Sequence, residues 1–183
     1  MYNRHTNPIG TPWGVAQSVT ILAPGITHLT TASHGGIHLD DQRQAKMPEI
    51  LRSADGYYEE DVCWARAAVI FPEGFSDYEH FWAVRTLVQW EPELWEPFTK
   101  TPPGAAALAR HDAFFEQNRA KFDIGCSSTS GNGWTLSARS LDRTRSIKIS
   151  CDCSYMDKLT VPFSIEDLER HRYAWTPETT TTT

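Results

Sequence analysis

The first third of the chain alternates apolar and polar residues with the two-residue period of β-strands. Residues 15–22 and 26–32 are rich in Val, Ile and Thr, which favour strands. Residues 23–25, Ala-Pro-Gly, favour a tight turn because Pro fixes φ and Gly tolerates positive φ. The glycine pair at 35–36 predicts a second turn, which leads into a short strand at 37–39. The pattern therefore predicts an antiparallel β-meander.

Beyond residue 40 the apolar residues recur at helical spacing. Asp40 or Asp41 is expected to cap a short helix at residues 42–47. A second helix is expected over residues 57–71, with the acids at 59–61 in its first turn, where the helix dipole favours negative charge. These segments predict helices that cover the meander.

A capping box, Ser76 with Glu79, predicts the start of a helix that runs to residue 90. Its apolar residues recur every three or four positions: Phe81, Val84, Leu87 and Val88. Residues 91–104 hold four prolines and are expected to form a linker with aromatic anchors. A further helix is expected over residues 105–121.

The period returns to two after residue 121. Three strand-like segments follow: residues 122–130, 134–140 and 145–156. Residues 131–133, Gly-Asn-Gly, predict the hairpin turn between the first two. Ser164 is expected to cap a last short helix at 165–172.

Together these elements predict an α+β fold, with an N-terminal antiparallel β-meander packed with helices and a C-terminal β-hairpin sheet with a short helix. The expected organisation follows this division. It comprises a flexible N-terminus at 1–11, the meander and its helices at 12–100, a helix and hairpin subdomain at 101–175, and a disordered tail at 176–183.

Composition fits an ordinary globular protein of 183 residues, with 40% hydrophobic and 22% charged residues. No apolar stretch is long enough to span a membrane, and the N-terminus has no apolar run typical of a secretory signal. We therefore expect a cytoplasmic protein. In that compartment the four cysteines, at 63, 126, 151 and 153, are expected to be thiols or metal ligands rather than disulfides.

The net charge is −6, and the acids concentrate toward the N-terminus. Residues 1–91 carry 11 acids and 6 bases, whereas residues 92–183 carry 12 and 11. Because an acidic surface repels nucleic acid, direct nucleic-acid binding is not expected of the molecule as a whole. A basic partner surface is favoured, unless the charge serves solubility alone.

The stretch TTASHGGIHLDD, residues 30–41, holds two histidines around the glycine pair. His34 and His38 are an even number of residues apart, so on a strand both imidazoles would project to one side. Imidazole is a common zinc ligand, and Asp40, Cys63 and the three acids of residues 59–61 are near in sequence. The metal-site hypothesis therefore joins both histidines with Glu59, Glu60 and Asp61 around zinc or another divalent ion.

Motif evidence does not single out that hypothesis. The chain lacks H-E-x-x-H and the deaminase zinc pattern, so the glycines could serve only a turn and the histidines only backbone hydrogen bonds. No cofactor is then expected. Cys151 and Cys153 would share one face of a strand near Cys126, and His171 could complete a zinc set; buried thiols are the favoured interpretation.

A basic cluster lies near the expected second hairpin. Its members are Arg139, Arg143, Arg145 and Lys148. With Trp134 nearby it could contact a phosphate backbone, but Asp142 dilutes its charge and a solvated turn explains it equally. Nucleophile elbows, Walker loops and dinucleotide-binding motifs are absent from the sequence.

Several short motifs carry a resemblance over residues 11–75. They are TPWG at 11–14, APGI at 23–26, TASHGGIHL at 31–39, MP at 47–48 and YYEEDVCWA at 57–65. The sequence resembles an uncharacterised domain family found in proteins of phages, plasmids and integrative elements. The resemblance implies a genomic setting and transfers no catalytic residue. Small proteins in that setting often inhibit host defence systems, including CRISPR effectors, by binding them.

Three functions remain open, and the favoured one is stoichiometric binding to a host protein or ribonucleoprotein complex. The alternatives are a metal-dependent hydrolase at the histidine and acid site, and a nucleic-acid-binding module at the 139–148 loop. Binding by charge predicts that function survives substitution of either histidine and fails when an acidic patch is reversed.

Overall fold

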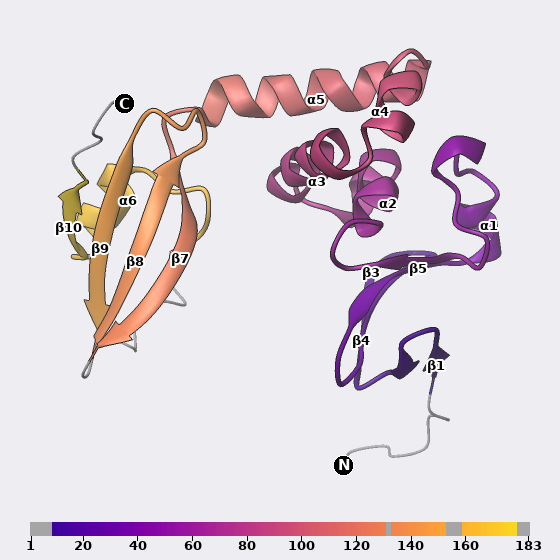
Figure 1. Cartoon of the computed structure of the whole chain (residues 1–183), viewed down its shortest axis with the longest axis horizontal. Helices are drawn as coiled ribbons and strands as arrows, with labels where there is room; N and C mark the ends of the chain where they lie inside the picture. The colour runs from indigo at the N-terminus through magenta and orange to yellow at the C-terminus, as the bar shows by residue number, and fades with distance from the viewer. Residues whose placement is uncertain (1–8, 131–132, 153–158, 179–183) are drawn as a thin grey trace. The chain divides into compact units, whose positions relative to one another are not determined.

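The computed structural model describes residues 9–130, 133–152 and 159–178. The chain divides into two compact units, residues 1–112 and 113–183. Each unit contains a four-stranded antiparallel sheet. Each unit also contains helices (Figure 1). The expected α+β fold is confirmed. No helix in these described ranges is long and apolar enough to cross a membrane.

The sheet of the first unit is a meander in the order β3-β4-β5-β6. The antiparallel meander of its first three strands was predicted, and the fourth strand was not. Its strands are β3 Ser18–Ala23, β4 Ile26–Thr30, β5 Gly35–Leu39 and β6 Tyr57–Glu59. Gly25 closes the β3–β4 turn with a φ of 79°, a conformation that glycine adopts without steric cost. A two-residue pair, β1 Gly10–Thr11 and β2 Gly14–Val15, precedes this sheet.

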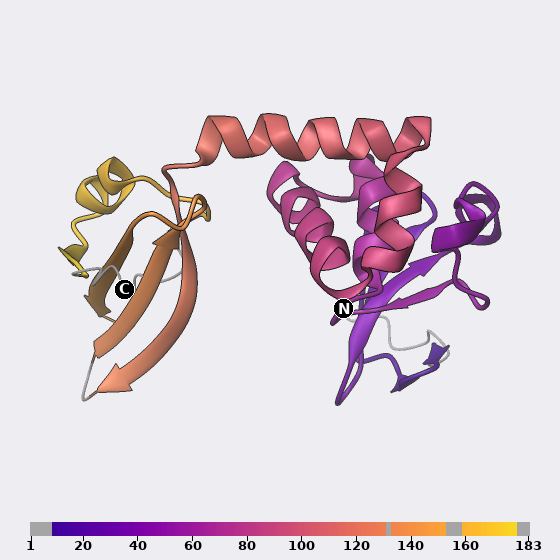
Figure 2. The same cartoon turned by 45° about the horizontal axis from the view of Figure 1, so that its top comes forward.

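The first unit holds short and long helices, two of which begin at the caps that the sequence predicts. They are α1 Asp41–Gln44, α2 Trp64–Ile70, α3 Asp77–Trp90 and α4 Pro92–Thr99, with 3₁₀ turns at Glu49–Leu51 and Pro72–Gly74. Helix α5, Pro102–Asn118, begins in the first unit and ends in the second. Asp40 caps α1 by accepting from Arg43 N, and the capping box of Ser76 and Glu79 begins α3 as predicted. In both views α2 and α3 lie on one side of the sheet (Figures 1 and 2).

The glycine pair is not the turn that we predicted. Gly35 and Gly36 lie inside β5, and the turn occupies the preceding residues, where Thr31 N donates to His34 O at 2.7 Å. A Cβ on Gly36 would lie 2.3 Å from the Tyr58 carbonyl oxygen. The glycines are therefore required by close packing of neighbouring backbone, a need that the local sequence does not reveal.

The acids at 59–61 do not begin a helix, so that prediction was wrong. Tyr57–Glu59 forms β6 instead, and α2 begins only at Trp64. Tyr58 explains the difference, because it pairs with Ile37 of the neighbouring strand β5 and its ring is fully buried. Its hydroxyl donates to Gln44 Oε1 at 2.8 Å. Burial of this aromatic residue outweighs the local helical pattern.

The expected linker at 91–104 is also wrong, since α4 and the start of α5 occupy it. Pro92 is the first residue of α4, where a missing amide hydrogen costs little. Trp95 and Phe98 are buried, which anchors the helix. In α3, Phe81, Val84 and Leu87 are buried as predicted, but Val88 is 52% exposed.

The second unit has the strand order β10-β9-β8-β7. Its elements are β7 Phe122–Ser130, β8 Gly133–Ser140, β9 Ser146–Asp152, α6 Ile165–Arg170 and β10 Ala174–Pro177. Phe122, Ile149 and Leu168 belong to its core, and Ser164 caps α6 as predicted. Strand β10 includes two residues of the expected tail. Residues 179–183 of that tail and residues 131–132 of the expected turn lie outside the described ranges.

Candidate functional site

Three of the residues predicted to bind metal come together at one end of the β5–β6 pair. His34, Glu59 and Glu60, which we call the His34 cluster, each offer a ligand atom within 4.8 Å of the others. His34 Nδ1 lies 3.8 Å from Glu59 Oε1. His34 directly precedes β5, and Glu59 ends β6. Because these strands are antiparallel neighbours, the two ends meet.

The turn before β5 holds His34 in place. Thr31 Oγ1 donates to the His34 carbonyl oxygen at 2.8 Å, and the His34 amide donates back to Thr31 Oγ1 at 3.2 Å. Such a side-chain cap fixes the backbone of a short turn. The imidazole itself remains about half exposed, at 53%, so a solute can reach it.

Gly35 makes room for the carboxylate of Glu60. A Cβ on Gly35 would lie 2.6 Å from Glu60 Oε2. The Glu60 amide donates to the Gly35 carbonyl oxygen at 3.0 Å, so the backbone of the acidic residue is fixed beside the glycine. The glycine pair thus shapes the cluster through close approach rather than through a turn.

Glu59 is the least exposed member of the cluster. Its Oε2 accepts a hydrogen bond from the Asp61 amide at 2.9 Å. Its Oε1 is inaccessible to solvent and has no hydrogen-bond donor within the described residues. An unsatisfied buried oxygen is unfavourable, and a cation beside it would supply the missing interaction. One imidazole and two carboxylates are a donor set that suits zinc or manganese.

Other members of the predicted metal set lie elsewhere. The His38 ring packs on Tyr57, with centroids 4.6 Å apart, and Tyr57 meets Trp13 edge-on. Asp61 contributes its backbone amide to Glu59. Cys63 is half-buried, and desolvation raises the pKa of its thiol, which disfavours the thiolate that a metal requires.

The predicted cysteine set in the second unit stays a prediction. Cys126 is in β7 and Cys151 in β9, with β8 between them; their side chains, and the whole of Cys153, lie outside the described part. His171 follows α6, and its ring lies near Tyr173, with centroids 6.3 Å apart.

The basic residues of the 139–148 loop do not form one patch with free charges. Arg145 lies over the Phe122 ring, 5.0 Å from its centroid, and Lys148 forms an ion pair with Glu178 at 3.3 Å. Arg139 is exposed on β8, while Arg143 lies in the β8–β9 turn with a φ of 64°. Arg145 and Lys148 are therefore engaged within their own unit.

Asp142 further neutralises this loop. Although desolvation acts to raise its pKa, hydrogen bonds from Ser140 and Thr144 dominate and lower that pKa. Ser140 Oγ donates to Asp142 Oδ1 at 2.7 Å, and Thr144 Oγ1 donates to the same oxygen at 2.7 Å. The carboxylate is thus a structural part of the turn, and it keeps a negative charge among the arginines.

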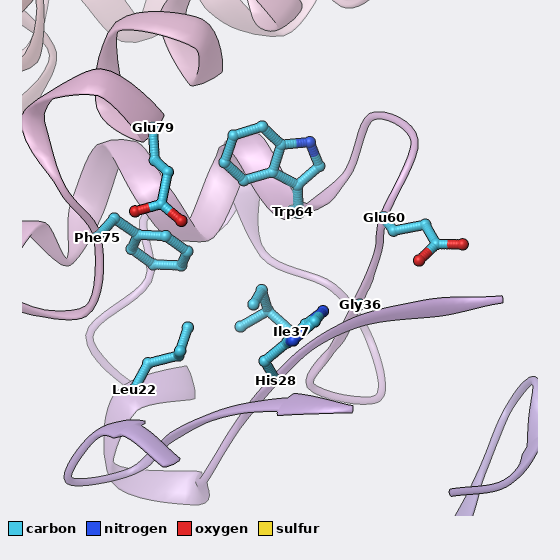
Figure 3. A pocket seen from close by; sticks show the side chains of 8 residues that line it. All are labelled: Leu22, His28, Gly36, Ile37, Glu60, Trp64, Phe75 and Glu79. Carbon is cyan, nitrogen blue, oxygen red and sulfur yellow. The ribbon is translucent and has the colours of Figure 1, made fainter. Parts of the chain in front are cut away.

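A cavity of about 190 Å³ lies between the sheet and helices α2 and α3. Its apolar walls are Leu22, Ile37, Trp64 and Phe75, and its polar lining includes His28, Glu60 and Glu79. Figure 3 shows the carboxylates of Glu60 and Glu79 on either side of the Trp64 indole. Glu60 thus belongs both to this cavity and to the His34 cluster.

Sequence reasoning did not find the cavity. Glu79 was assigned only to the capping box, and His28 lies opposite Ile37 only because of the strand register. The signal that could have found them is the meander itself, since it aligns alternate residues of β4 and β5 on one face. Helix α3 then brings Glu79 to that face.

The fold and these features define a class: an α+β protein with an acidic, cavity-bearing meander unit. A family profile described as Domain of unknown function (DUF7007) matches residues 6–120. The chain therefore belongs to that family, and the match includes the His34 cluster and the cavity. The matched range also includes residues 11–75, which carry the short motifs described above. No curated protein and no solved structure matches the chain.

Proposed function

We propose that this chain is a stoichiometric binding protein whose N-terminal unit docks on a positively charged surface of a host macromolecule. The observation that carries the proposal is the distribution of charge between the units. Residues 1–112 hold 14 acids and 8 bases, which is the entire net charge of −6, whereas residues 113–183 hold 9 of each. Such a unit attracts basic surfaces and repels nucleic acid.

The acidic run Glu59–Asp61 supplies the most concentrated charge of this unit. Glu60 and Asp61 are exposed, and Glu59 is partly so. Within the described ranges, no lysine or arginine forms an ion pair with any of the three. Among the described residues their charges therefore have no lysine or arginine partner, and they are available to another molecule.

The resemblance to phage and mobile-element proteins indicates which partners to test first. Host defence complexes of the cytoplasm, such as CRISPR effectors, hold nucleic acid in channels that are lined by lysine and arginine. The same basic side chains bind carboxylates. We therefore propose a nucleic-acid-guided defence complex as the partner class, with inhibition by occupation of its channel.

Capture of a purified effector complex tests the proposal. The wild-type chain and the variant Glu59→Gln/Glu60→Gln/Asp61→Asn serve as immobilised baits at 50 and 300 mM salt. We expect the variant to capture about tenfold less complex at low salt, because steering and register depend on these charges. Capture by the wild type should fall as salt rises.

A matched control removes the same number of charges from the second unit. Glu116, Glu166 and Glu169 are exposed acids there, and their replacement by Gln should leave capture within twofold of the wild type. Equal capture by both triple variants, or none by the wild type, would contradict the proposal.

A second candidate function is divalent-metal binding at the His34 cluster, as part of a hydrolytic centre. The specific observation that favours it is the buried Glu59 Oε1, which has no donor among the described residues and faces an imidazole at 3.8 Å. A bound ion would polarise water or a substrate carbonyl there, and the exposed imidazole leaves an approach for substrate.

Calorimetric titration with Mn²⁺ and with Zn²⁺ separates the two candidates. Metal binding predicts that His34→Ala and Glu60→Gln each weaken affinity at least about tenfold, whereas the exposed control Glu49→Gln does not. Binding by charge predicts that His34→Ala leaves partner capture unchanged. If the wild type shows no heat of binding with either ion, the metal-binding function is wrong.

A further inference from the structure

We infer that the cavity between the first sheet and helices α2 and α3 binds an organic cation, supplied by a basic side chain of the partner. The source of the cation rests on the proposed function, but the cation chemistry does not. It follows from the residues that line the cavity, from their geometry and from its size.

The charges of the lining favour a cation. Glu60 and Glu79 both line the cavity, and among the residues that the structure describes no lysine or arginine does so. His28 is the third ionisable residue that the described part of the chain contributes to the lining. A cleft with two carboxylates and apolar walls concentrates a negative potential, because low-dielectric walls focus the field.

The aromatic residues of the lining favour an organic cation over a hydrated metal ion. Trp64 and Phe75 have ring centroids 6.3 Å apart and planes tilted by 43°, so they form two walls that meet at an angle. Indole is the strongest aromatic partner of ammonium and guanidinium groups. Leu22 and Ile37 complete an apolar surface, which suits the alkyl stem of such a group.

The Glu79 carboxylate is fixed before any ligand arrives. Its Oε2 accepts from both the amide and the hydroxyl of Ser76, each at 2.7 Å, within the capping box of α3. A preorganised charge loses little entropy when it binds. Figure 3 shows this carboxylate over Phe75, on the side of Trp64 opposite Glu60.

The volume limits the ligand to the size of a side chain. At about 190 Å³, the cavity is smaller than the roughly 300 Å³ at which drug-sized sites begin. The end of a lysine or arginine side chain fits this limit. A nucleotide or a larger cofactor does not.

Titration with small probes tests the cation chemistry on the isolated chain. The probes are butylammonium, butylguanidinium and neutral pentanol, and the readout is the indole N–H signal of Trp64 in a nitrogen-correlated NMR spectrum. We expect both cations to shift this signal with millimolar affinity, and pentanol to bind at least about tenfold more weakly.

Two variants and one control connect that signal to the carboxylates. Glu79→Gln keeps the capping box, since Gln serves at that position, and it should weaken cation binding about tenfold, as should Glu60→Gln. Glu93→Gln, an exposed acid of α4, should leave binding unchanged. Equal binding of pentanol and the cations, or no shift at all, would overturn the inference.

Partner capture then tests the source of the cation. Glu79 lies outside the 59–61 run, so reduced capture by Glu79→Gln indicates that a partner side chain enters the cavity. If the cation probes bind but Glu79→Gln captures as much partner as the wild type, a partner side chain does not enter the cavity. That result would overturn the proposed source and assign the cavity to a free amine. Probe binding without capture by the wild type would instead contradict the proposed function and leave the cation chemistry supported.

Discussion

The two units of this protein share a sheet architecture but differ in net charge. Both contain four antiparallel strands and a buried apolar core. The first unit carries all of the net negative charge, while the second is neutral. In the second, Arg145 lies on Phe122 and Lys148 pairs with Glu178, so these charges are satisfied internally.

This difference is the basis for proposing the first unit as the binding surface. In the first unit the acids gather at the end of β6 and at the cavity, where the described residues offer them no arginine or lysine. Carboxylates that no lysine or arginine neutralises are available for association. The first unit is therefore the site to perturb, and the second supplies controls.

The largest expected effect comes from filling the close contact between β5 and β6. A Cβ in Gly36→Ala would lie 2.3 Å from the Tyr58 carbonyl and 2.5 Å from Trp13 Cη2, and backbone cannot yield easily. We expect a loss of about 3 kcal/mol in unfolding free energy. Urea unfolding followed by tryptophan fluorescence measures it, since five of the seven tryptophans are in the first unit.

The second sheet provides the matched glycine. In Gly125→Ala the new Cβ would meet only Ser137 O, at 3.6 Å, which is an ordinary contact, so stability should change by less than about 1 kcal/mol. Similar losses in the two variants would show that the two sheets tolerate side chains alike.

Next in size is the loss of a partly buried ion pair in the first unit. Arg66 forms a two-point contact with Glu91, whose side chain is only 11% exposed. Glu91→Gln would leave the guanidinium short of its counter-charge, at a cost of about 2 kcal/mol. The surface pair Lys148–Glu178 is the comparison, and Glu178→Gln should cost at most about 1 kcal/mol. Equal midpoint shifts in urea would refute this distinction.

Protonation of a buried histidine gives a smaller, pH-dependent effect. His80 is 1% exposed and its Nε2 lies 2.9 Å from Ala107 O; desolvation lowers its pKa below the ordinary 6.5. The unfolded chain then binds a proton more readily than the folded one. Stability should therefore fall as pH drops below 6.5, by at most about 1.4 kcal/mol per pH unit, and level off below the folded pKa.

Comparison of the wild type with His80→Gln isolates this term. Unfolding free energies at several pH values between 7.5 and 4.5 should show a shallower acid decline in the variant. The same decline in both proteins would assign the pH dependence to other groups.

The sequence predicted those parts of the fold that depend on local chemistry. The Pro24–Gly25 turn, the capping box at Ser76 and the cap at Ser164 need only residues a few positions apart, and all are confirmed. Strand β6 and helix α4 were missed because burial of Tyr58 and of Phe98 decides them. That burial depends on distant segments.

The same distinction governs the candidate site. The sequence placed His34, Glu59 and Glu60 in one group, and the structure brings them together. It also placed His38 there, but strand pairing sets that ring against Tyr57. The cavity required the β4–β5 register and the position of α3 together, neither of which a local pattern contains.

The smallest expected effect contrasts two turns. Gly25 adopts positive φ between β3 and β4, whereas Arg143 adopts a φ of 64° between β8 and β9. Left-handed backbone costs a residue with a Cβ about 1 kcal/mol, so Arg143→Gly should be more stable than Arg143→Ala by roughly that amount. Because both variants lack the arginine side chain, their difference in urea unfolding reports the backbone alone; equal stability would mean that this turn stores no strain.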